Sequence, residues 1–323
     1  MANILKKIKD KIYFTLNPPP AKHSFSVSDI FFANCKEKEF LRWDVTVKYL
    51  AVENYYGKND FGFSLYGKMQ NARTGREVAE TSADNFKKLI ISWEENGYLE
   101  DSCIYLDNDL TLQNGAHRLA MAIYHNMPYI NAYYLHRDKP ADFSEKFFTE
   151  NEFTAEEIAV IKAKSEELAD RLNTAFPCII WAPAFPFADE ILEDFRSYGK
   201  VSDIRKHTYD KKDFETAVRN IYSVDNIAKW KIDKKLEFFT KYSCELISFN
   251  LLMPYPDFKL NAGGDTVVSQ ICANAKKTIR AKYKDRIEDY IYDIILHTCD
   301  NYHQSAFMHK VLSEDNSHEL VMQ

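Results

Sequence analysis

The spacing of hydrophobic and polar residues along the chain predicts amphipathic helices separated by short strands. Residues 83–96, ADNFKKLIISWEEN, repeat apolar positions at helical spacing and lead to Gly97, a residue typical of a helix C-terminus. Residues 44–52, DVTVKYLAV, alternate and are rich in β-branched side chains. They predict a strand, with Glu53 just past its end.

The segment from residue 102 to residue 135 predicts a compact unit of strand, turn, helix and strand. An acidic turn separates two short strands, and Asn114-Gly115 forms a tight loop immediately before a helical repeat. The expected strands are 103–106, 110–112 and 129–135, and the expected helix is 116–126.

Residues 141–175 are charged and helical in pattern, and they predict a connector between a domain at 1–140 and a second domain at 176–323. Beyond the connector, strands alternate with helices. The predicted strands are 177–185, 200–209 and 243–254, and the predicted helices are 187–198, 211–222, 226–241 and 266–282. The expected fold class is therefore α+β or α/β: an α+β domain, a helical connector and a second α/β domain.

Residues 3–15 place apolar side chains at helical spacing with lysines between them, which predicts a short basic amphipathic helix. Such a helix suits packing on its own domain, the commoner role, or weak contact with a membrane surface. No apolar run approaches the roughly 18–20 residues that span a bilayer. The start lacks the continuous apolar region of a signal peptide, so a cytoplasmic location with reduced thiols is expected.

Composition narrows the classes of function. The chain has 323 residues, of which 14% are aromatic, and such residues need a packed interior. Its net charge is −6, and neither half is basic: residues 1–150 hold 19 Lys/Arg against 20 Asp/Glu, and residues 151–323 hold 23 against 28. Duplex-binding domains usually carry a basic surplus, so nucleic acid is an unlikely partner.

The stretch Leu-Gln-Asn-Gly-Ala-His-Arg-Leu-Ala carries the clearest chemical pattern. Gly115 closes a turn and a helix begins at once, so the first backbone N–H groups of that helix are unpaired and the site is electropositive. His117 and Arg118 add donors at the same place. These features predict a phosphate cradle whose residues are Asn114, Gly115, Ala116, His117 and Arg118, with a turn carrying a surface His-Arg pair as the alternative.

This segment resembles the phosphate-binding box of the ParB/sulfiredoxin superfamily, and the resemblance covers roughly residues 40–137. Sulfiredoxins carry their catalytic cysteine where this chain has Ala116, so their reductase chemistry is nearly excluded. The DNA-segregation members bind CTP and use a Gly-Glu-Arg-Arg box with a DNA-reading module. Here Ala116 and His117 replace the Glu and the first Arg, and the second part shows no basic module.

The remaining branch resembles free-serine kinases and implies ATP, or another nucleotide, and Mg²⁺. In that branch a carboxylate after the first strand acts as a base, which here implies Glu53, with His117 as a further catalytic candidate. Arg73 is a further phosphate-binding candidate, at the end of a helix expected over 60–72. Asp107 and Asp109 are candidates for the metal, although Asp in a turn is more often structural.

The second part shows no family motif but holds candidate ligands. Lys276 and Arg280 share a helix face, and a polar run containing His297, Asp300 and His303 directly follows an apolar segment. Phosphate-bearing sugars or nucleotides suit these groups. On the basic helix 226–241, Lys231, Lys234 and Lys235 also share a face, which is usually solvated.

Three functions follow from these patterns. The first is a nucleotide-dependent phosphotransferase acting on a hydroxyl of a small molecule or glycan precursor, for instance in surface-polysaccharide assembly. The second is a nucleotide-binding regulatory or DNA-associated module of the ParB type. The third is a nucleotidyl- or glycosyltransferase whose active site lies in the second domain.

Overall fold

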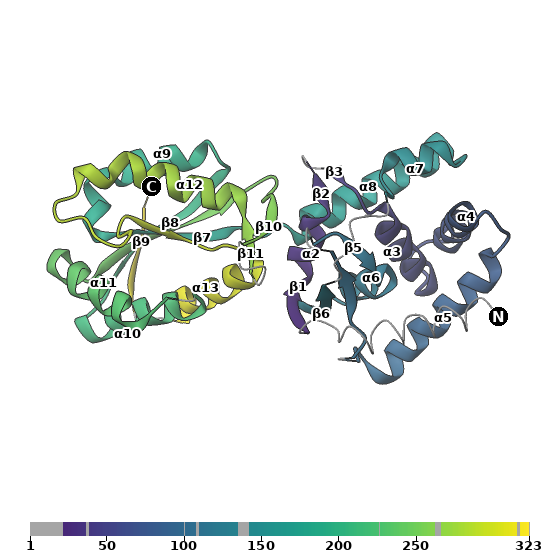
Figure 1. Ribbon diagram of the computed structural model, residues 1–323, viewed down its shortest axis with the longest axis horizontal. Helices are drawn as coiled ribbons and strands as arrows, with labels where there is room; N and C mark the ends of the chain where they lie inside the picture. Colours follow the sequence, from purple (N-terminus) through teal and green to yellow (C-terminus); the bar gives the residue numbers. More distant parts are fainter. Residues whose placement is uncertain are drawn as a thin grey trace. The chain divides into compact units, whose positions relative to one another are not determined.

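A computed structural model describes residues 22–36, 39–99, 101–107, 110–134, 142–225, 227–261, 266–314 and 317–322. The chain is a mixed α/β protein that divides into two compact units, Met1–Ala169 and Asp170–Gln323 (Figure 1). The helix expected at 3–15 and the metal candidate Asp109 lie outside the described residues. No described helix combines the length and the apolar character that crossing a bilayer requires.

Unit 1 contains a four-stranded sheet with helices packed around it (Figure 1). The sheet order is β1 (His23–Ser26), β6 (Tyr129–Tyr134), β4 (Ile104–Leu106) and β5 (Leu112–Asn114), with a parallel β4–β6 pair between antiparallel neighbours. A two-stranded ribbon pairs β2 (Cys35–Lys36) with β3 (Glu39–Phe40). The helices are α2 (Val27–Ala33), α3 (Trp43–Tyr55), α4 (Gly62–Thr74), α5 (Ala79–Asn96), α6 (Ala116–Tyr124), α7 (Glu145–Glu150) and α8 (Ala155–Leu172).

The predicted strand at 44–52 is wrong, because these residues form most of helix α3. Every residue from Trp43 to Val52 is buried, so the helix is enclosed by the rest of unit 1 on all sides. A fully enclosed helix needs no polar face, and a short apolar run of this kind cannot be told from a strand by periodicity. The first strand expected from the ParB-like resemblance is therefore absent at this position.

A buried group of charges fixes the N-terminal turn of α3. Both oxygens of Asp44 accept from Arg42, with Nε 2.8 Å from Oδ1, and Lys48 Nζ lies 2.9 Å from Oδ2. Burial alone raises the pKa of Asp44, but the two cations hold it well below its usual range. Lys48 is only 1% exposed, and burial lowers its pKa to about 8 against the attraction of Asp44. Arg42 also donates to the backbone carbonyl of Leu112, which ties α3 to β5.

The segment expected to connect the domains carries two helices that belong to unit 1. Helix α8 buries Ile161 and Leu168, and its Ser165 hydroxyl lies 2.8 Å from the hydroxyl of Thr46 on α3. The division between the units falls within the last turn of α8, after Ala169. Much of the charged segment is therefore part of the packing of the first unit.

Unit 2 contains a five-stranded sheet with helices on both faces (Figure 1). The order is β12 (Leu296–Thr298), β7 (Phe176–Trp181), β9 (Glu245–Leu252), β8 (Lys200–Thr208) and β13 (His318–Val321), and all four neighbouring pairs are antiparallel. Helices α9 (Ala188–Arg196) and α12 (Gln270–Tyr283) cover one face. Helices α10 (Lys211–Ile221), α11 (Lys229–Tyr242) and α13 (Tyr302–Glu314) cover the other.

Short elements complete unit 2. The 3-10 turns are η1 (Ala182–Phe187), η2 (Tyr222–Val224) and η3 (Lys284–Arg286). The helix predicted at 266–282 begins as strand β11 (Val267–Ser269), which pairs with β10 (Phe258–Leu260). Helix α12 starts only at Gln270, where the Ser269 hydroxyl caps it by accepting from the Cys272 N–H at 3.1 Å.

Replacing Asp44 tests the buried charge group. Asp44→Asn keeps the side-chain shape but leaves Arg42 and Lys48 buried without their carboxylate, which costs about 3–5 kcal/mol. We expect faster amide hydrogen exchange in peptides from α3, measured by mass spectrometry. The control Glu150→Gln, in an exposed pair with Lys146, should exchange like the wild type. Equal exchange in Asp44→Asn and the wild type would contradict the stabilising role.

Candidate functional site

The turn at Gly115 has the local geometry expected of a phosphate cradle. Strand β5 ends at Asn114, Gly115 adopts φ 101°, and α6 begins at Ala116. A Cβ atom on Gly115 would lie 2.6 Å from Cγ2 of Ile104, so only glycine fits both the backbone conformation and the space. The strand–turn–helix predicted here is confirmed, with Asn114 exposed at its tip.

The side chains of this turn are largely used within unit 1. His117 Nε2 lies 2.8 Å from the Tyr66 hydroxyl, and its ring centroid lies 4.6 Å from that of Phe86. Burial, with the charges of nearby cations, lowers the pKa of His117 well below its ordinary value, so the ring is neutral at pH 7. Arg118 Nη1 donates to the Cys103 carbonyl at 2.7 Å. The two donors expected at the cradle therefore make internal contacts.

The other candidates in unit 1 are not gathered at this turn. Glu53 lies near the C-terminal end of α3 and forms an ion pair with Lys164 of α8 at 3.2 Å. Asp107 is buried and accepts from the Thr111 N–H at 2.8 Å and from Gln113 Nε2 at 3.1 Å, which is a structural turn. Arg73 is exposed near the end of α4, and it is among the cations that lower the pKa of His117.

In unit 2, by contrast, most of the predicted residues converge. A pocket of about 440 Å³ lies at the free side of the edge strand β12, between residues of α11 and α12. We refer to it as the β12 pocket. Its charged lining consists of three cations and three carboxylates around one histidine: Lys235, Lys276, Arg280, Asp225, Asp293, Asp300 and His297.

One cation of the β12 pocket, Lys235, has no carboxylate partner among the described residues. Lys235 is 5% exposed, and its ammonium donates to the Tyr222 hydroxyl at 3.3 Å and to the Asp293 carbonyl at 3.4 Å, with no carboxylate of a described residue within 4.0 Å. Burial, followed by the charge of Arg280, lowers the pKa of Lys235 to about 8. Buried ammonium groups usually have a close counter-charge, so this arrangement favours an anion in the pocket.

Arg280 is held by contacts that leave one donor free. Its Nη2 donates to the Leu296 carbonyl at 2.9 Å, and its Nη1 lies 3.4 Å from Asp293 Oδ2. Its Nε is buried and has no hydrogen-bond partner among the described residues. Lys276, four residues earlier on α12, pairs with Asp300.

The acidic groups of the β12 pocket differ in their charge state. Burial, and then the charge of Asp300, raise the pKa of Asp225 to about 6. Asp225 Oδ2 lies 3.8 Å from His297 Nδ1, and burial lowers the pKa of His297 well below its ordinary value. A carboxyl group with a pKa close to neutral, in a pocket with a cation that lacks a close carboxylate, is a candidate for acid–base chemistry.

Four of the residues predicted for unit 2 line the β12 pocket: Lys276, Arg280, His297 and Asp300. The fifth, His303, is exposed on α13 and does not line it. Within the described parts of the chain, no three His, Cys, Asp or Glu side chains are grouped to hold a metal ion, so the set His297, Asp300 and His303 does not form a metal cage. The six cysteines all lie in the described part of the chain, and none of them forms a disulfide.

The β12 pocket does not lie where the sequence pattern predicted a ligand site. The sequence argument placed a ligand site where strands of an α/β sheet end, which applies to parallel strands. The pairs of this sheet are antiparallel, and the pocket lies beside an edge strand. Sequence reasoning assigned Lys235 to a solvated face and missed Asp225. The signal for Lys235 was its place between Ile232, Leu236 and Phe239, which are buried.

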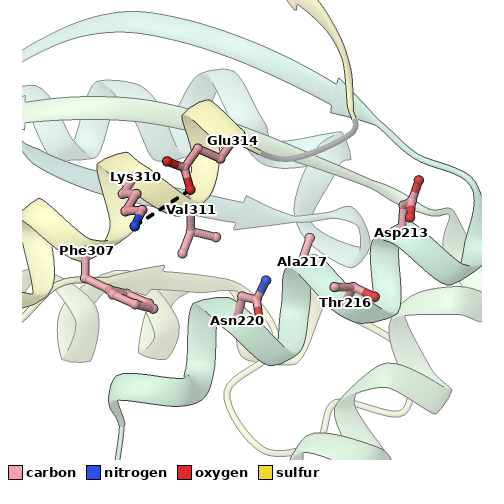
Figure 2. A pocket seen from close by; sticks show the side chains of 8 residues that line it. All are labelled: Asp213, Thr216, Ala217, Asn220, Phe307, Lys310, Val311 and Glu314. Carbon is pink, nitrogen blue, oxygen red and sulfur yellow. Dashed lines mark ion pairs between the residues drawn. The ribbon is translucent and has the colours of Figure 1, made fainter.

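A second hollow of unit 2 lies between α10 and α13 (Figure 2). Its centre is lined by Ala217 and Val311, and Asp213 and the Lys310–Glu314 pair stand at its edges. Lys310 is already paired within its own helix, so this hollow offers no unneutralised cation. None of the predicted site residues lines it.

Comparison with known proteins adds no assignment: no family model, no curated protein and no solved structure matches this chain.

The raised pKa of Asp225 predicts a pH-dependent stability. Asp225 lies near Asp300 and opposite Lys235, Lys276 and Arg280, and the folded state favours its protonated form. The contribution of the protonated carboxyl to the stability of the fold is therefore fully present below about pH 4 and is lost as the pH rises through about 6. Asp225→Asn has no such loss. We expect the variant to gain up to about 2–3 kcal/mol relative to the wild type between pH 4 and pH 7. Thermal unfolding at both pH values measures this gain, and an equal difference at the two would contradict it.

Proposed function

We propose that the β12 pocket binds a phosphate ester, of the nucleotide or sugar-phosphate class, and that the protein is a transferase acting on that ester. The observation that carries this proposal is Lys235, a buried cation without a close carboxylate, beside Arg280, whose contact with a carboxylate is the 3.4 Å pair with Asp293. Both line the same pocket of about 440 Å³, which is large enough for a small molecule. A phosphate group would supply the missing negative charge.

Group transfer is supported by the acid–base group beside these cations. In the proposed step, an acceptor hydroxyl oxygen forms a bond to phosphorus, and its proton passes to the Asp225 carboxylate. The bond between phosphorus and the leaving oxygen breaks, and that oxygen keeps the electron pair. Lys276 and Arg280 would stabilise the charge that develops on the phosphate oxygens.

Mg²⁺ commonly accompanies such transfer, and proteins hold it with one or two carboxylates together with substrate phosphates. Asp300 is the carboxylate of the β12 pocket that would contact it, which leaves Asp225 for the proton. A complete protein cage is not needed for this mode of binding.

A second candidate is the nucleotide site in unit 1 that the ParB/sulfiredoxin resemblance implies, with ATP as ligand. One observation favours it: the N-terminus of α6 follows Gly115 directly, and Lys48, Arg73 and Arg118 lower the pKa of His117 against the opposing charge of Asp44. In this role Arg73 would contact phosphate, whereas Glu53, paired with Lys164, would not act as the base.

Removing the charge of Lys235 separates the two candidates. Lys235→Met deletes a buried, poorly paired cation, so the variant should be at least as stable as the wild type. Its affinity for inorganic phosphate and for ATP, measured by titration calorimetry on the full chain, should fall at least tenfold. Asp225→Asn should bind ATP but should not release ADP in the presence of an acceptor.

Lys241→Met is the matched control, because Lys241 is exposed on the same helix. It should bind like the wild type. If Arg73→Ala or Arg118→Ala abolishes ATP binding while Lys235→Met has no effect, the nucleotide site lies in unit 1 and the proposal for the β12 pocket is wrong.

A further inference from the structure

Another hollow, distinct from the one between α10 and α13, adjoins the β12 pocket along helix α12. It has a volume of about 410 Å³ and shares Lys276, Arg280 and Asp293 with the β12 pocket. Lys277 and Lys284 line it as well. We refer to this hollow as the α12 groove.

The charge of the α12 groove is strongly unbalanced. Four cations line it, Lys276, Lys277, Arg280 and Lys284, against the single carboxylate of Asp293. Lys276, Arg280 and Lys284 follow one another at intervals of four residues, so they form one row about 12 Å long. Lys276 is paired with Asp300 and Arg280 with Asp293, so the positive charge without a carboxylate partner lies at the end of the row, at Lys284, and on Lys277 beside it.

Cations on the opposite side of the same segment are neutralised instead. Lys282 Nζ lies 2.7 Å from Asp194, and Arg286 pairs with Glu190 at 2.8 Å, both on α9. Lys277 and Lys284 are exposed and form no ion pair with any residue that the structure describes. The excess of positive charge is therefore confined to the side that carries the α12 groove.

We infer that the ligand of unit 2 carries a chain of two or more phosphates, which runs from the β12 pocket past Arg280 into the α12 groove. This inference rests on the proposed function, because the first phosphate is the one bound by Lys235 and Arg280. The further phosphates contact Lys277 and Lys284. The row of cations is longer than one phosphate group, which favours a diphosphate or triphosphate over a monophosphate.

The experiment compares inorganic phosphate, pyrophosphate and tripolyphosphate by titration calorimetry at about 0.15 M salt, where the Debye length is about 8 Å. The wild type should bind pyrophosphate and tripolyphosphate at least tenfold more tightly than phosphate. The double variant Lys277→Gln/Lys284→Gln should lose this gain and keep its affinity for phosphate. The control Lys282→Gln/Arg286→Gln removes the same charge from the same segment and should keep the gain.

The outcomes separate the two proposals. If the double variant keeps the gain, or if the control loses it equally, the phosphate chain does not enter the α12 groove and the inference is wrong, while the β12 pocket proposal stands. If Lys235→Met binds phosphate as tightly as the wild type does, the proposed function fails, and the inference fails with it.

Discussion

Burying a positive side chain costs free energy unless a negative charge is buried with it, and the two units meet this constraint differently. In unit 1 a single carboxylate, Asp44, pairs with both Arg42 and Lys48 at the start of the enclosed helix α3. In unit 2 Lys235 is buried almost as deeply, but only a hydroxyl and a backbone carbonyl receive its hydrogen bonds. The first arrangement is self-sufficient and therefore structural. The second is incomplete without an anion, which is why the functional argument centres on unit 2.

The sequence predicts an element of this protein where the pattern of apolar and polar residues along that element shows which of its sides is buried. The amphipathic helix α5 and the strand–turn–helix around Gly115 were predicted because one face of each is polar or because a glycine marks the turn. Helix α3 was missed because its neighbours in space bury all of its sides, and residues 44–52 carry no trace of those neighbours. A pattern of apolar positions reports how many sides of an element are buried, and full burial removes the difference between helix and strand.

The same reasoning explains the outcome for the candidate sites. Lys276 and Arg280 could be found from sequence because they share a helix face, and His297 and Asp300 because polar residues follow an apolar strand. Lys235 looked solvated beside Lys231 and Lys234, although it occupies the apolar stripe of α11. For the turn at Gly115 the backbone geometry was predictable, but the direction of each side chain depends on distant partners. Tyr66 and Cys103, which engage His117 and Arg118, lie 51 and 15 residues away.

The place of the β12 pocket beside an edge strand follows from how that edge is protected. An edge strand presents unpaired backbone groups that can pair with another chain, and among the described strands β12 pairs with β7 alone. Arg280 donates to the Leu296 carbonyl of β12, so one side chain both covers the edge and is held in a fixed orientation by it. A guanidinium has five donors in a rigid plane, and this one commits Nη2 to the strand and Nη1 to Asp293, so its plane is fixed at the pocket. A lysine at this position would supply charge without a fixed direction, so the edge strand and the anion site depend on the same arginine.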